Sequence, residues 1–115
     1  MSDNSKFFLK LEKLQKTVYA SVSGDFAPED ANDFVVDYTK IVKSIDPKEY
    51  DLKFDCTKLK VTANNMTEML QACLEMYKND GFKSVVFDCT GNVVMGMQLR
   101  RLGNAVGLQN FDIVK

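Results

Sequence analysis

The tetrapeptide Phe54-Asp55-Cys56-Thr57 recurs, letter for letter, as Phe87-Asp88-Cys89-Thr90. Each copy ends a run of strand-forming residues and stands before a helical pattern. We therefore predict two successive βα units that use the same residues at the strand end, and Phe111-Asp112 is a partial third copy. If the two strands are parallel neighbours, both copies lie on one edge of the sheet, where α/β proteins usually bind ligands.

Strand and helix patterns alternate outward from this repeat. Alternating apolar residues predict strands over 7–13, 17–23, 50–56, 82–89 and 111–114, and apolar stripes predict helices over 28–45, 66–77 and 94–106. The unbroken run Val85-Val86-Phe87 is typical of a strand covered on both faces. The order β-β-α-β-α-β-α-β predicts one α/β domain over residues 1–115, with a mainly parallel sheet and one antiparallel edge strand.

Composition narrows the class of protein. The 115 residues are 45% hydrophobic and 27% charged, and the net charge of -1 gives no basic excess for nucleic acid or a membrane surface. The three cysteines are expected to be reduced thiols, and with no signal peptide or membrane span we expect a cytoplasmic protein. The chain has no histidine, the commonest general base and metal ligand. We therefore expect no enzyme, no metal and no cofactor.

The carboxylates of the repeat are the first candidates for chemistry. Asp55 and Asp88, with Thr90 and Asn92 nearby, form a possible site at the sheet edge. Two carboxylates can hold Mg²⁺ or share a proton. They can equally accept backbone N–H bonds in loops or at helix starts. No third acidic residue or phosphate-binding loop joins them, which favours the second interpretation.

Sulfur-containing residues allow two further interpretations. Cys56 and Cys89 point to the same side of the predicted sheet, as a redox pair would, but there is no CxxC motif and buried cysteine is common in cores. Several methionines could line an adaptable ligand cavity, although such residues more often fill a core. They are Met66, Met69, Met76, Met95 and Met97.

The polar stretch 57–65 is the most suggestive surface. It is predicted as a loop between a strand and a helix, and Asn64 or Asn65 is a good N-cap for that helix. Free N–H groups at such an end suit a phosphate, while a plain connecting loop is the alternative. The candidate partner-binding residues are Thr57, Lys58, Lys60, Thr62, Asn64, Asn65 and Thr67.

Three segments in this order resemble the STAS domain of anti-sigma factor antagonists and sulfate transporter tails. They are Gly24-Asp25-Phe26 before a helix, the first copy of the repeat before a short loop and helix, and Gly107-Leu108-Gln109-Asn110-Phe111-Asp112-Ile113 at the last helix-to-strand turn. The element order extends the resemblance over nearly the whole chain. It implies a STAS-like fold and a non-catalytic regulatory role.

The sequence departs from that family at its switch. In the family a partner kinase phosphorylates a serine at the start of the second helix, within an Asp-Ser-Ser-Gly-like motif. That motif falls on Ala63, Asn64, Asn65 and Met66, so neither serine is present. Thr62 and Thr67 are the nearby hydroxyls. The family's last helix has no counterpart before Lys115, which would leave apolar surface for a homodimer or another partner.

Our hypothesis from the sequence is a STAS-like interaction module without the usual serine switch. It docks a regulatory protein through 57–65 and the start of the second helix. The alternative is a small-molecule or lipid-binding α/β domain. An enzyme using Asp55, Asp88 or a cysteine ranks third. The partner's identity, the oligomeric state and modification of Thr62 or Thr67 do not follow from the sequence.

Overall fold

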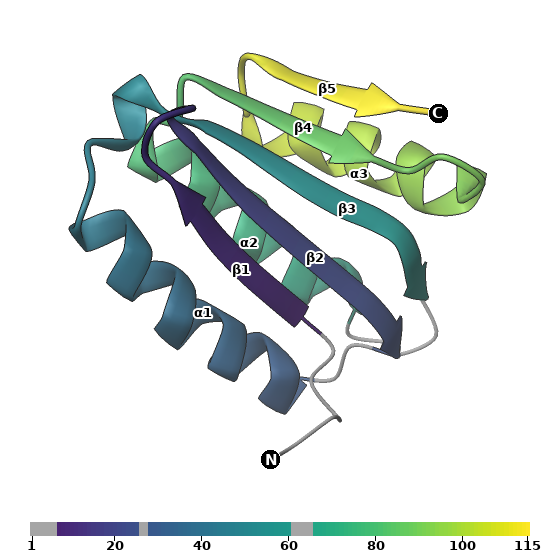
Figure 1. The fold of residues 1–115 in the computed structure, drawn as a ribbon. Coiled ribbons are helices and arrows are strands. Elements are labelled where there is room, and N and C mark those ends of the chain that lie inside the picture. Colours follow the sequence, from purple (N-terminus) through teal and green to yellow (C-terminus); the bar gives the residue numbers. More distant parts are fainter. Residues whose placement is uncertain (1–6, 26–27, 61–65) are drawn as a thin grey trace.

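The computed structural model describes residues 7–25, 28–60 and 66–115 (Figure 1). The strands are β1 (Phe7–Glu12), β2 (Thr17–Asp25), β3 (Asp51–Lys60), β4 (Ser84–Asp88) and β5 (Phe111–Val114). The helices are α1 (Pro28–Lys43), α2 (Met66–Asp80) and α3 (Val93–Val106), with a short 3₁₀ turn at Pro47–Glu49. Among the described helices, none has the length and apolar character needed to span a bilayer.

The strands form one mixed sheet in the order β1-β2-β3-β4-β5. β1 pairs with β2 antiparallel, and the other three pairs are parallel. Every crossover therefore steps across the sheet in the same direction, and right-handed crossovers of that kind place their helices on the same face. Figure 1 shows α1, α2 and α3 on one side of the sheet. The α/β class and the mixed five-stranded sheet agree with the sequence prediction.

The prediction that β4 is covered on both faces is wrong. Val85 and Phe87 are buried against the helices, whereas Ser84, Val86 and Asp88 alternate with them and stay partly exposed. Because all three crossovers pack on one face, no helix in the described ranges covers the other. The apolar run marked the centre of the sheet and not a three-layer arrangement.

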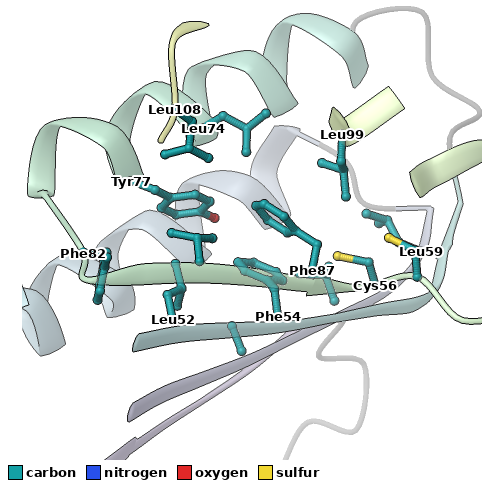
Figure 2. Close-up of a cluster of buried hydrophobic side chains, with 14 of the residues drawn as sticks. Leu52, Phe54, Cys56, Leu59, Leu74, Tyr77, Phe82, Phe87, Leu99 and Leu108 are labelled. Carbon is teal, nitrogen blue, oxygen red and sulfur yellow. The ribbon is translucent and has the colours of Figure 1, made fainter. Parts of the chain in front are cut away.

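Aromatic side chains fill the layer between the sheet and the helices (Figure 2). The Phe54 ring on β3 lies 5.9 Å from Phe87 on β4, 5.7 Å from Phe34 on α1 and 5.8 Å from Tyr77 on α2, measured between ring centroids. Burying side chains of this size stabilises a fold by roughly 1.5–3 kcal/mol each. Phe54 thus ties the first copy of the repeat to two helices and to the second copy.

α3 approaches β5 closely at a glycine. A Cβ atom added at Gly103 would stand 2.7 Å from Cζ of Phe111, so only a residue without a side chain lets the helix pack this near. The helix then ends at Gly107, whose φ of 79° is left-handed. This contact positions the start of α3 over the edge of the sheet at which β2–β5 finish, here called the carboxyl edge.

The predicted boundary of β3 is also wrong. The strand does not stop at Cys56 but continues to Lys60, so the first part of the presumed loop 57–65 is strand. Its extra length pairs with the end of β2, with Ser23 opposite Lys58 and Asp25 opposite Lys60. Residues 61–65 lie outside the described residues. The polar composition had indicated a loop, but an available edge of β2 captured the segment.

Candidate functional site at the carboxyl edge

The two copies of the repeat lie side by side. Phe54 is the register partner of Phe87, and Asp55 is the register partner of Asp88. The expectation that the copies occupy neighbouring parallel strands at one edge is confirmed. The aspartates project from the open face, while the phenylalanines and cysteines are buried on the helix-covered face.

Each aspartate is bonded to the threonine two residues further on. Asp55 Oδ1 accepts hydrogen bonds from the Thr57 backbone N–H (3.0 Å) and hydroxyl (2.7 Å). Asp88 Oδ1 accepts the same two bonds from Thr90, at 3.0 and 2.7 Å. The Thr90 hydroxyl and N–H lower the pKa of Asp88 because they stabilise its charged form. The carboxylates therefore act as local caps.

In β3 this bond accompanies a β-bulge. Ser21 on β2 pairs with Asp55, but Ser23 pairs with Lys58, so β3 places Cys56 and Thr57 opposite the single residue Val22. A bulge leaves a backbone group without its ladder partner. The Asp55 carboxylate gives the Thr57 N–H a partner, and the strand resumes beyond the bulge.

Asn92 holds the extended end of β3 against the start of α3. Its Nδ2 donates to the carbonyl oxygens of Cys56 (2.9 Å) and Leu59 (2.8 Å). The β3–β4 register ends at Asp55 and Asp88, so both carbonyls lie beyond the reach of β4. The side-chain amide replaces the missing strand. Thus all four residues of the predicted sheet-edge site, including Thr90, belong to one hydrogen-bonded framework.

The predicted partner-binding residues separate into two groups. Lys58 and Lys60 are exposed at the end of β3, Thr57 is half-buried and bonded to Asp55, and Thr67 is half-buried in the first turn of α2. Thr62, Asn64 and Asn65 lie outside the described residues. The two lysines are therefore the described members of this set that a partner can reach most easily.

Sequence reasoning missed an apolar patch on α3. Val93, Val94 and Met97 are 68%, 65% and 68% exposed; we call these three residues the α3 patch. Val94 had been assigned to the core-facing stripe, but Met95, Leu99 and Leu102 are the residues that α3 buries. The signal was the run Val93-Val94-Met95, because adjacent helical positions cannot all face one core.

The interior leaves little room for a ligand. A cavity among the described residues measures about 40 Å³ and is lined by apolar side chains that include Met69, Cys73 and Tyr77. Small-molecule sites usually enclose about 300–1,000 Å³. In the described ranges, no group of three cysteine, aspartate or glutamate side chains is placed to hold a metal ion. The described geometry therefore favours a surface over a cavity as the functional site.

Comparison with known proteins identifies no relative. No protein-family model matches the sequence, and no curated protein matches it. The resemblance to the STAS domain thus stays a prediction that rests on the three quoted segments and on the order of the elements.

Proposed function

We propose that this chain is a STAS-like, non-catalytic interaction module that docks a regulatory protein at its carboxyl edge. The observation that carries the proposal is the α3 patch, three large apolar side chains exposed together at the start of one helix. Exposed apolar groups that adjoin one another on a small domain mark interaction surfaces. Single exposed apolar residues elsewhere on the chain need no such explanation.

The state of the polar groups supports binding over catalysis. A general acid or base must reach the proton that it transfers. Asp55 and Asp88 each have an oxygen occupied by two bonds from threonine, and the Asn92 amide spans two backbone carbonyls. These side chains shape the edge of the sheet and leave the α3 patch and nearby cations to meet a partner.

Charge around the patch defines the chemistry of that partner. Arg101 lines a depression with Val94 and Met97, and Lys58 and Lys60 are exposed on β3, which Asn92 joins to the start of α3. An apolar surface bordered by cations suits a segment with apolar anchors and flanking carboxylates. Residues 61–65 and Thr67 complete the proposed docking surface. With asparagine at 64 and 65, the usual serine switch has no acceptor there; Thr62 and Thr67 are the remaining hydroxyls.

The test compares two exposed apolar sites at opposite ends of the sheet. The double variant V93E/M97E places charge in the α3 patch, whereas Leu14→Glu alters a fully exposed leucine in the β1–β2 turn. Quantitative capture from native extract should fall at least about tenfold for V93E/M97E, which corresponds to about 1.4 kcal/mol. Leu14→Glu should capture the same protein as the unaltered chain.

Two results would contradict the proposal. One is equal capture by V93E/M97E and the unaltered chain, with both folded by circular dichroism. The other is a dimeric mass by light scattering that becomes monomeric in V93E/M97E without any captured protein. That second result would assign the patch to another copy of the chain.

A further inference from the structure

Two buried thiols occupy matching places in the repeat. Cys56 and Cys89 each follow the last register pair, Asp55 with Asp88, and their side chains are 2% and 1% exposed. Neighbouring strands run about 4.8 Å apart, which lies within the Cα separation of roughly 4.4–6.8 Å that a disulfide accepts. The repeat therefore brings two cysteines together without a CxxC motif.

The two thiols differ in their electrostatic surroundings. The Cys56 thiol is hydrogen-bonded to the sulfur of Cys89, and this bond together with burial raises the pKa of Cys56. The same bond lowers the pKa of Cys89, even though burial and the charges of Asp88 and Asp55 oppose this change. A thiolate is the reactive form of cysteine. Cys89 is thus the nucleophile of the pair, and Cys56 is the proton donor beside it.

A surface cavity of about 210 Å³ leads to Cys89. Its lining consists of Cys89, Asn92, Val93, Gly96, Met97, Arg100 and Lys115. A water molecule takes up about 30 Å³ of liquid volume, so the cavity has room for a small peroxide. Gly96 keeps the approach open, because a Cβ there would stand 3.9 Å from Sγ of Cys89. Arg100 and Lys115 add positive charge to the cavity wall, which suits a thiolate.

We propose that Cys56 and Cys89 form a redox-active dithiol that a hydroperoxide converts into an intramolecular disulfide. The Cys89 thiolate attacks the peroxide, the O–O bond breaks, and the departing alkoxide takes up a proton to leave as an alcohol. The sulfur of Cys56 then attacks the Cys89 sulfenic acid, and the departing hydroxide takes the Cys56 proton to form water. Two thiols and one hydroperoxide give one disulfide, one alcohol and one water.

Cys73 provides an internal control. It lies on α2 outside the repeat, and burial raises the pKa of its thiol to about 11, so it remains protonated near neutral pH. Limited hydrogen peroxide followed by alkylation and peptide mapping should show Cys56 linked to Cys89 and Cys73 alkylated. A thiol reductant should restore all three free cysteines.

The unaltered protein alone can overturn the proposal. A disulfide that contains Cys73, a disulfide only between chains, or three free cysteines after a dose that oxidises the unfolded chain would each do so. None of these outcomes bears on docking at the α3 patch, because the proposed dithiol does not depend on the proposed interaction.

Single variants test the order of the two steps. Cys56→Ala should stop the reaction at a sulfenic acid on Cys89, which a 1,3-diketone traps. Cys89→Ala should leave Cys56 unlabelled, and the matched variant Cys73→Ala should form the disulfide as the unaltered chain does. Trapping at Cys56 in Cys89→Ala, at the rate seen for Cys89, would contradict the assigned roles.

The cavity route has its own variant. Gly96→Ala would narrow the approach to the Cys89 sulfur and should slow disulfide formation several-fold at a fixed peroxide concentration. The rate is followed by rapid alkylation, after circular dichroism has shown that the helix content is unchanged. An unchanged rate would overturn access through this cavity.

Discussion

The two copies of Phe-Asp-Cys-Thr share their local hydrogen bonds, yet the chain leaves them along different paths. In both, the aspartate accepts from the threonine N–H at 3.0 Å and from its hydroxyl at 2.7 Å. After Thr57 the chain resumes as strand to Lys60, whereas after Thr90 it turns and enters α3 at Val93. The tetrapeptide thus determines a local turn but not the element that the chain enters after it.

The surroundings explain the difference. β2 extends far enough to pair with residues 58–60, and Asn92 supplies donors on the other side of β3. The second copy is followed by Gly91, whose φ of 75° directs the chain away from the strand. Lys58 stands at the equivalent position of the first copy and continues the strand. One residue and one neighbouring strand therefore separate the two outcomes.

The largest expected effect comes from removing the side chain that supports the first copy. Asn92→Ala deletes two hydrogen bonds to β3 and should lower the free energy of unfolding by about 1–3 kcal/mol. Amide hydrogen exchange should accelerate at residues 57–60 and not at Thr90. Asn104→Ala, an exposed position on the same helix, is the matched control and should change stability by less than about 0.5 kcal/mol. Equal effects of the two variants would contradict the role of Asn92.

A smaller effect should follow from altering the residue after the second copy. A Cβ atom at Gly91 would meet nothing within 4 Å, so the cost of Gly91→Ala is that of the left-handed backbone alone, about 1–2 kcal/mol. Lys58→Ala, at the equivalent place in an extended and exposed segment, should cost less than about 0.5 kcal/mol. Urea denaturation measures both. If Lys58→Ala were the more damaging variant, glycine would not be what separates the copies.

The smallest effect concerns the titration of the second copy. The pKa of Asp88 is lowered in the folded protein, so its bonds to Thr90 stabilise the fold above the ordinary aspartate pKa of about 3.9. This stabilisation is lost as the pH falls through the folded-state pKa. Thr90→Val should raise the pKa of Asp88 toward its ordinary value, as read from its side-chain carbon resonance. Thr57→Val should leave the Asp88 titration unchanged, and an equal shift in both variants would show that the two turns are coupled.

Periodicity along the chain was sufficient to predict most of the fold. Alternating residues in β2 and the stripes of α1 and α2 report which side of each element is apolar, and their order indicated a mainly parallel sheet. The antiparallel first strand and the neighbouring copies of the repeat agree with the structure. Capping by Asp55 and Asp88 was also predictable, because those bonds reach only two residues along the chain.

The candidate site was less predictable because it depends on contacts between distant segments. Thr57, Lys58 and Lys60 look like loop residues until β2 is placed beside them. The half-open sheet follows from three crossovers on one face, which no single strand records. The α3 patch arises because α3 presents Met95 and Leu99 to the core and leaves Val94 outside.

The repeated tetrapeptide shows where the two kinds of information meet. The sequence alone determined its turn, its buried phenylalanine and its alternation of faces, since these depend on bonds and steric effects within a few residues. Only the tertiary structure decided that β3 continues past Thr57, that Asn92 bridges to it, and that Cys56 and Cys89 become neighbours. Each of those outcomes requires a partner more than 30 residues away, whose position is set by the packing of the whole sheet.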